Sequence, residues 1–208
     1  MHYETRPFLA GPADMQLPPL EYFGPRIMVC GTSNTGKSTL AVALGNRLDR
    51  PVVHLDQLHF QPYTDWRERP AEEFAALHRQ AIAGDDWVME GNYSRVIGER
   101  LGRATGIILL SSNRWVNFAR YLRRTLLERD SRLGNLAGNR DSLKWSMVTW
   151  VLAQGPRNIA PYRTMLPASG LPFLELCSMR DVRRAYAAWT LTFPSSPAPA
   201  GRRLRRCP

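Results

Sequence analysis

The sequence predicts an α/β fold, in which helices flank both faces of a five-stranded parallel sheet. Short apolar runs alternate along the chain with segments whose apolar side chains recur every three or four positions. The first apolar run is followed at once by the pattern G-x-x-x-x-G-K-S, and a helical pattern begins directly after it. A loop of this kind between a strand and a helix is typical of the P-loop NTPase three-layer sandwich, so we expect that architecture here.

The expected elements follow in chain order. The first strand is expected at 26–30, and the helix after the loop shows an apolar stripe at Leu40, Leu44 and Leu48. Four further apolar runs predict the remaining strands, at 51–56, 87–90, 106–110 and 173–177. Helical patterns begin at Arg69 and near Val96, extend over 114–128 and 142–153, and begin once more after a capping box at 178–181.

The loop is expected to bind the phosphates of a nucleotide. Its two glycines permit close backbone approach, and its amides together with the helix N-terminus attract negative charge. Lys37 is one of two lysines in a chain with 26 arginines, and its compact ammonium suits a tight loop where a planar guanidinium does not fit. The expected nucleotide-binding residues are Gly31, Thr32, Ser33, Asn34, Thr35, Gly36, Lys37, Ser38 and Thr39.

Two acidic residues are expected beside this loop. Asp56 and Glu90 each follow a predicted strand, and the carboxyl ends of parallel strands meet at one edge of a sheet. Ser38 is expected to bind magnesium directly and Glu90 through a water molecule. Asp56 is expected to accept the proton of an acceptor hydroxyl or to orient the acceptor. The alternatives are a helix or turn cap for Asp56 and an exposed strand-end acid for Glu90.

Arginines dominate the segment after the fourth strand. Arg120 and Arg124 lie one helical turn apart, so both guanidinium groups share one face of the predicted helix 114–128. We expect them to clamp the transferring phosphate from a lid at about 129–141. The alternative is a solvated basic face. Trp66 either stacks on a substrate or covers its loop.

Composition divides the chain into one domain with two extensions. Residues 25–192 are expected to form the domain, preceded by a proline-containing flexible extension, 1–24. The tail 193–208 is rich in proline and alanine and then in arginine, which predicts a disordered basic segment. The net charge of +10 comes mainly from 112–140 and from this tail. Weak contact of the tail with nucleic acid is possible on this basis, and a solvated tail is the alternative.

The remaining composition excludes several classes. No apolar run approaches the ~20 residues that cross a bilayer, so no membrane span is expected. The three cysteines are widely separated, which argues against a disulfide framework or a zinc site. Cys30 and Cys177 lie in apolar runs and are expected to pack as small hydrophobic side chains. A cytoplasmic protein is the resulting expectation.

Several motifs together resemble those of a known family. The segment 26–40, the His-Leu-Asp of 54–56, the Gly-Asn-Tyr that follows Glu90, and the pair Arg120 and Arg124 are similar to those of the adenylate-kinase-like P-loop kinases. The closest likeness is to the group often labelled DNA topology modulation protein, and it covers roughly residues 26–190. It implies a five-stranded parallel sheet, ATP with Mg²⁺, and a mobile lid.

The chain departs from that family pattern at three points, which bear on its catalytic rate. Glu90 stands where the family usually has aspartate. Ser111 stands where an acid usually follows the fourth strand, and Asn34 and Thr35 occupy a part of the loop where many relatives have a further glycine.

Two functions follow as hypotheses. The first is an ATP-dependent kinase that transfers the γ-phosphate to a small-molecule acceptor, either a nucleotide or another metabolite. The second is a nucleotide-binding regulator of nucleic acid with weak or no kinase activity, which predicts DNA affinity that falls steeply with salt. The chemistry of the predicted site favours the kinase.

Overall fold

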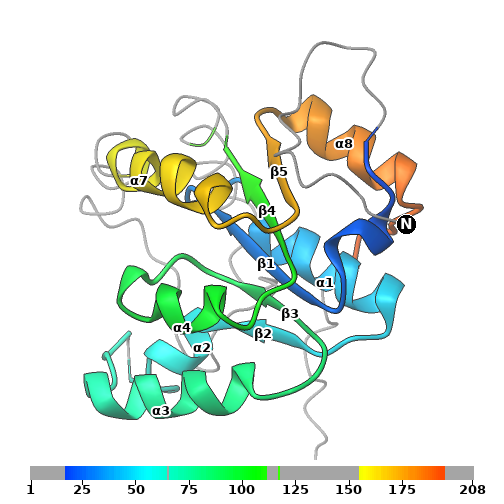
Figure 1. The fold of residues 1–208 in the computed structure, drawn as a ribbon. Helices are drawn as coiled ribbons and strands as arrows, with labels where there is room; N and C mark the ends of the chain where they lie inside the picture. The colour runs from blue at the N-terminus through cyan, green and yellow to red at the C-terminus, as the bar shows by residue number, and fades with distance from the viewer. Residues whose placement is uncertain (1–16, 65, 112–116, 118–154, 195–208) are drawn as a thin grey trace, which may run out of the picture.

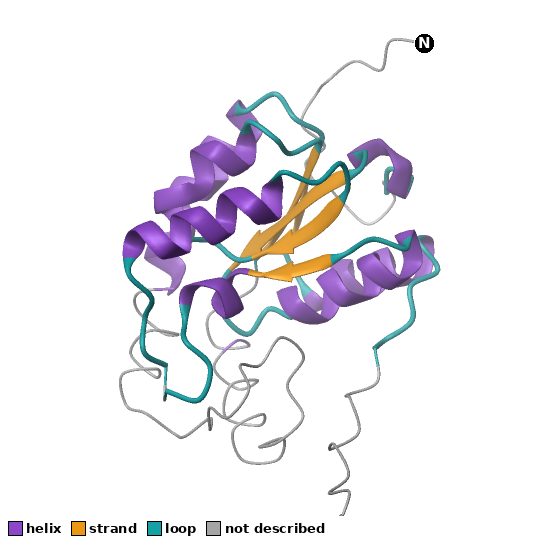
Figure 2. Ribbon diagram, turned by 90° about the horizontal axis from the view of Figure 1, so that it is seen from below, coloured by secondary structure: helices purple, strands orange, loops and turns teal. Residues whose placement is uncertain are grey.

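A computed structural model describes residues 17–64, 66–111, 117 and 155–194. Five parallel strands form one sheet in the order β2-β3-β1-β4-β5, with helices on both of its faces (Figures 1 and 2). The strands are β1 (Arg26–Gly31), β2 (Val52–His54), β3 (Trp87–Glu90), β4 (Gly106–Leu110) and β5 (Phe173–Leu176). The predicted α/β class and its five-stranded parallel sheet are thus confirmed.

The described helices connect these strands and cover the sheet. They are η1 (Leu20–Phe23), α1 (Lys37–Leu48), α2 (Leu55–His59), α3 (Ala71–Ile82), η2 (Ser94–Val96), α4 (Ile97–Leu101), α7 (Gly155–Ala168) and α8 (Met179–Ala188). Ser178 caps α8 by accepting a hydrogen bond from the Asp181 amide, as the capping-box pattern predicts. None of the helices in the described part of the chain is long and apolar enough to cross a bilayer.

Alternating side chains of the strands build a core on each face of the sheet. On β1, Ile27 and Val29 pack into the layer that contains η1, α1 and α8. Met28 and Cys30 point the other way, into the layer that contains α3, α4 and α7. Because both faces are buried, the strands are almost wholly apolar, which explains why short apolar runs predicted them.

Four local features differ from the expectations. The second strand ends at His54, so Asp56 lies in the first turn of α2. The helix α7 was not predicted, because Pro161 and Pro167 lie inside it and proline normally breaks helical patterns. Cys177 is exposed and does not pack as a core residue.

The fourth difference concerns the N-terminal extension. Its described part, from residue 17, packs onto the domain: Leu20 and Phe23 are buried in the core. The indole nitrogen of Trp189 also donates a hydrogen bond to the Pro18 carbonyl at 2.9 Å.

Several predicted features lie outside the described residues. These are Arg120 and Arg124, the expected helix over 114–128 apart from Asn117, the expected helix over 142–153, the lid at about 129–141, and almost all of the basic tail. They stay predictions.

Candidate functional site

The P-loop connects β1 to α1, and its backbone requires glycine at both ends. Gly31 has φ +146°, and a Cβ atom there would lie 2.1 Å from the Leu110 carbonyl oxygen. Gly36 directly precedes α1 in a left-handed conformation, with φ 93°. A side chain at either position would therefore displace the loop or strain it.

Hydrogen bonds fix the path of the loop. The Thr32 amide donates to the Leu110 carbonyl at 3.2 Å, which joins the loop to the end of β4. The Thr32 carbonyl accepts hydrogen bonds from the Thr35 hydroxyl at 2.8 Å and from the Lys37 ammonium at 2.9 Å. The side-chain amide of Asn117 donates to the Thr32 hydroxyl at 3.1 Å. Lys37 thus folds back over its own loop, where bound phosphates would be held.

Ser38 and Glu90 meet beside the loop. The Ser38 hydroxyl donates to Glu90 Oε1 at 3.0 Å, and His54 Nδ1 lies 3.0 Å from the same oxygen. Burial raises the pKa of Glu90, but the hydrogen bond from His54 and the charge of Lys37 outweigh burial and hold that pKa below its usual value. The Glu90 carboxylate is therefore ionised although only 5% of the residue is exposed.

This pair fits a magnesium ion. Mg²⁺ prefers hard oxygen ligands and keeps several of its waters, so one hydroxyl and one nearby carboxylate are the donors it needs from a protein that also binds phosphates. Asn34 indicates separately that the loop binds a polar ligand. Its side-chain nitrogen, a hydrogen-bond donor, is buried and makes no hydrogen bond in the described structure.

Asn92, which follows β3, connects that strand to Gly31, the first residue of the P-loop. Its side chain accepts a hydrogen bond from the Gly31 amide and donates one to the Gly31 carbonyl, both at 3.0 Å. The guanidinium of Arg100 donates to the Asn92 carbonyl at 2.7 Å. Arg100 is fully buried, and burial lowers its pKa. A buried arginine is costly, so its place beneath the loop indicates a functional or architectural requirement.

The sequence analysis assigned no role to Asn92 or Arg100. Asn92 stood inside the Gly-Asn-Tyr motif without a stated task. The signal for Arg100 was its position one turn after Val96, on the buried side of the short helix, where a charged residue is not expected.

Asp56 and Tyr93 form a second polar pair. The Tyr93 hydroxyl donates to Asp56 Oδ1 at 2.6 Å. Burial and the negative charge of Asp56 raise the pKa of Tyr93, so its hydroxyl stays protonated and keeps donating. Tyr93 adopts φ 36°, and its ring lies against those of His59 and Phe74. Asp56 is therefore held by Tyr93, a residue that follows β3 and has a strained backbone.

Trp66 belongs to the loop between α2 and α3. Its ring meets that of Phe60 edge-on at a centroid distance of 5.4 Å. An isolated bridge between Phe60 and Glu68 and a hydrogen bond from the Arg69 amide to the His59 carbonyl at 2.8 Å close this loop on itself. This arrangement favours the interpretation in which Trp66 covers its loop.

A third polar cluster lies on the other side of the P-loop. The Ser111 hydroxyl donates to Glu175 Oε1 at 2.6 Å, and Arg163 of α7 donates to that oxygen at 2.8 Å and to the Ser111 hydroxyl at 2.9 Å. Ser111 stands where the family pattern has an acid. In the structure the acid is Glu175, on the neighbouring strand β5. The pairing of β4 with β5 brings it to Ser111, and no local sequence pattern predicts that contact.

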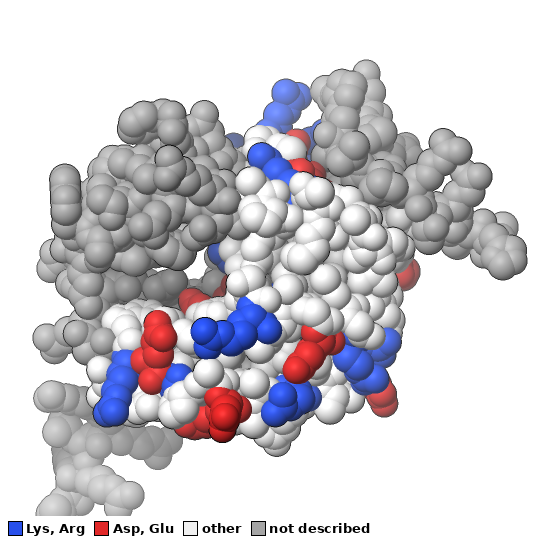
Figure 3. Space-filling view, turned by 60° about the vertical axis from the view of Figure 1, so that its left-hand side comes forward, with Lys and Arg blue, Asp and Glu red and all other residues white. Residues whose placement is uncertain are grey.

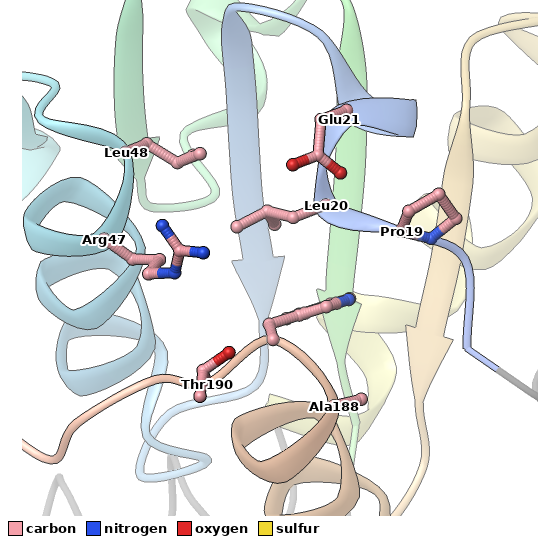
Figure 4. Close-up of a pocket in the computed structure, with 8 residues that line it drawn as sticks. Pro19, Leu20, Glu21, Arg47, Leu48, Ala188 and Thr190 are labelled. Atoms are coloured by element: carbon pink, nitrogen blue, oxygen red, sulfur yellow. The ribbon is translucent and has the colours of Figure 1, made fainter.

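A small pocket of about 140 Å³ lies away from this site, between the ends of α1 and α8 (Figure 4). Arg47 and Leu48 line it from the last turn of α1, whereas the P-loop precedes the first turn of that helix. The pocket is therefore at the opposite edge of the sheet and is separate from the P-loop. Its other lining residues are Pro19, Leu20, Glu21, Ala188, Trp189 and Thr190.

The surface of α3 and α4 carries both signs of charge. Arg69 pairs with Glu73 at 2.7 Å and Arg79 with Glu99 at 3.6 Å. On the face that Figure 3 shows, basic and acidic side chains lie next to one another. Among the residues that the structure describes, that face is not a continuous basic surface.

Comparisons with known proteins agree with this fold. No protein-family model and no curated protein matches the chain. Among solved structures, a gluconokinase from Sinorhizobium meliloti 1021 matches with a TM-score of 0.52 and 16% sequence identity, over 81% of this chain and 93% of that one. Shikimate kinases from Bacteroides thetaiotaomicron and Aquifex aeolicus vf5 match with TM-scores of 0.47 and 0.48 and identities of 19% and 11%. These two matches cover 80% and 79% of this chain and 99% and 96% of theirs. The match to the gluconokinase shows a shared fold.

Proposed function

We propose that this protein is an ATP-dependent kinase that transfers the γ-phosphate to a hydroxyl group of a small molecule. The observation that carries the proposal is that three groups of polar side chains lie where the neighbouring strands β2, β3 and β1 end. These are the P-loop with Lys37, the pair of Ser38 and Glu90, and the pair of Asp56 and Tyr93. Phosphoryl transfer requires mainly positioning and charge neutralisation, and these groups supply both.

Each group has a task in the proposed reaction. The loop amides and Lys37 hold the phosphates of ATP. Ser38 and Glu90 hold magnesium, which when bound neutralises charge on the phosphate oxygens. The acceptor oxygen forms a bond to the γ-phosphorus while the bond from that phosphorus to the bridging oxygen breaks, and its electron pair leaves with ADP. Asp56 takes the proton that the acceptor hydroxyl loses.

Two further assignments stay proposals of the same account. Arg120 and Arg124 would clamp the transferring phosphate from the lid, where such arginines contribute ~10³-fold or more in rate. The likeness to the DNA topology modulation group rests on sequence motifs alone. The matching gluconokinase makes small polyhydroxy acids the first acceptor class to examine.

The test is acceptor-stimulated release of ADP from ATP in the presence of Mg²⁺. The panel comprises D-gluconate, shikimate and nucleoside monophosphates, and each is assayed with the wild type and with Lys37→Ala. The proposal predicts that at least one acceptor stimulates ADP release by the wild type and that the variant shows no stimulation. A panel without any stimulation counts against it. DNA affinity that falls steeply with salt, together with inactivity on the whole panel, would favour the nucleic-acid regulator instead.

A further inference from the structure

We infer that Tyr93 is a positioning residue, which sets Asp56 relative to the P-loop through the segment 91–93. The inference rests on the proposed function and deepens it. It begins from the hydrogen bond of 2.6 Å between the Tyr93 hydroxyl and Asp56 Oδ1. That bond joins the loop after β3 to α2 across 37 positions of the sequence. It engages one carboxylate oxygen, and the proposal assigns the other, Oδ2, to the acceptor.

The residue before Tyr93 is fixed to the P-loop itself. Asn92 makes two hydrogen bonds of 3.0 Å to the backbone of Gly31, the first residue of the loop. Arg100, wholly buried, holds the Asn92 carbonyl from below at 2.7 Å. Tyr93 therefore cannot move far relative to the loop. Its hydroxyl, through the hydrogen bond to Asp56, restricts the position of that carboxylate in turn.

The backbone of this segment is strained in the way expected of a positioning element. Tyr93 has φ 36°, a left-handed conformation that is unfavourable for a residue with a side chain. Gly91 has φ +130°, and a Cβ atom there would lie 2.9 Å from that of Leu55 in α2. The contacts of the Tyr93 ring with His59 and Phe74, at centroid distances of 4.8 and 5.2 Å, hold it in this conformation.

The chemical consequence concerns the proton of the acceptor. As the acceptor oxygen bonds to the γ-phosphorus and ADP leaves, the acceptor proton passes to Asp56 Oδ2 and later to solvent. The Tyr93 hydroxyl keeps its own proton and donates to Oδ1 throughout. It thereby holds the carboxylate at the angle that the transfer requires, and a small misplacement of a reacting group is costly in rate.

The experiment compares Tyr93→Phe, Asp56→Asn and the double variant with the wild type, using the panel acceptor that the wild type phosphorylates best. Tyr93→Phe removes one hydroxyl and keeps the ring contacts. We expect its kcat to fall about 10- to 100-fold while KM for ATP stays unchanged, because the loop is intact. Asp56→Asn is expected to lose about 10²- to 10⁴-fold in kcat. The double variant is expected to be no slower than Asp56→Asn, since Tyr93 acts through Asp56.

Tyr22→Phe is the matched control, because Tyr22 lies in η1 at the other edge of the sheet, and its kcat should equal that of the wild type. Equal kcat for Tyr93→Phe and the wild type, or losses that multiply in the double variant, would overturn the inference while leaving the proposed function intact. A wild type that phosphorylates nothing overturns the proposed function itself.

A second measurement needs no ligand. Urea unfolding of the wild type, Tyr93→Phe, Asp56→Ala and the double variant of these two substitutions gives the coupling between Tyr93 and Asp56 in the free state, because each single variant removes the hydrogen bond. Non-additive changes in the free energy of unfolding support the contact, and strictly additive changes contradict it.

Discussion

The two edges of the sheet differ in the charged side chains that they carry and in what these side chains contact. At the carboxyl-end edge, Lys37 donates to the Thr32 carbonyl of the P-loop, and Glu90 accepts a hydrogen bond from the Ser38 hydroxyl. At the amino-end edge, arginines bind backbone carbonyls: Arg26 donates to those of Asp85 and Arg103. Arg103 donates to those of Ile82, Ala83 and Gly84, and Arg50 to that of Gly24.

The difference explains part of the arginine excess. Loop carbonyls that no strand pairs with need donors, and a planar guanidinium supplies several in a fixed arrangement. Arginine therefore closes the amino-end edge, whereas a lysine stands where phosphates are expected. If this comparison holds, substitutions of Lys37 and Glu90 reduce activity far more than stability, and substitutions at the amino-end edge do the reverse.

The largest effect is expected for Lys37→Ala. Loss of the ammonium removes a charge that stabilises the transferring phosphate, so kcat should fall by about 10³-fold or more. The melting temperature should change far less than the activity, because the hydrogen bond of the ammonium goes to its own loop carbonyl in the described structure. Steady-state kinetics and thermal unfolding of the same preparation measure both quantities. Retained transfer would remove the P-loop from the proposed mechanism.

Glu90→Gln should also act on activity, by roughly 10²-fold in kcat. The amide keeps the size of the side chain and can still contact Ser38 and His54. It removes a negative charge that repels phosphates when no metal is bound, so ATP should bind more tightly than to the wild type in the presence of EDTA. Calorimetric titration with and without Mg²⁺ tests this sign. Weaker binding in EDTA would contradict the placement of Glu90 beside the phosphates.

Acid should destabilise the protein through His78, a buried residue of α3 that belongs to neither edge of the sheet. Burial, with a smaller contribution from the Arg100 charge, lowers the pKa of His78 from 6.5 to about 4. His78 is neutral in the folded state and gains a proton on unfolding, so its contribution to stability is complete above pH 6.5 and is lost as pH falls towards 4. We expect the free energy of unfolding to fall by about 2 kcal/mol from this residue between pH 7 and pH 5.

Urea unfolding at the two pH values, with His78→Leu for comparison, measures that loss. The variant should show a smaller pH dependence over this interval. An unchanged dependence would assign the acid sensitivity to other groups.

The smallest effect is expected at the amino-end edge. The Thr105 hydroxyl lies within hydrogen-bond distance of the Arg26 amide and of the carbonyls of Phe23 and Arg26. Thr105→Val keeps the shape but leaves these groups without that partner, so the free energy of unfolding should fall by about 1 kcal/mol. Activity at saturating ATP should not change. Thr192→Val, at an exposed threonine, is the control and should alter neither quantity.

The sequence predicted best what local patterns encode. The apolar runs predicted all five strands, because the sheet is covered on both faces and most of its strand side chains are buried and apolar. The P-loop was predicted from its residues and from the strand and helix beside it. The helix α7 was missed because its prolines outweigh its helical pattern. The end of β2 was placed two residues late, because the apolar run continues into α2.

Contacts across the sequence could not be predicted in this way. Asn92 meets Gly31 across 61 positions, and Ser111 meets Glu175 across 64. Both contacts exist because parallel strands that are distant in the chain lie side by side. The sequence analysis could expect Asp56 and Glu90 at one edge from the fold class, but not that Tyr93 would hold Asp56 or that His54 would hold Glu90.

The central claim is that the carboxyl-end edge of the sheet transfers the γ-phosphate of ATP to a small hydroxylated acceptor. Phosphorus NMR of ATP, Mg²⁺ and the acceptor panel with the wild-type protein tests it most directly, with Lys37→Ala as the comparison. The account predicts a new phosphate-ester resonance that grows as the γ-phosphate resonance declines, with ADP formed in equal amount, and neither change with the variant. No new ester with any acceptor, or the same ester formed at the same rate by Lys37→Ala, would contradict it.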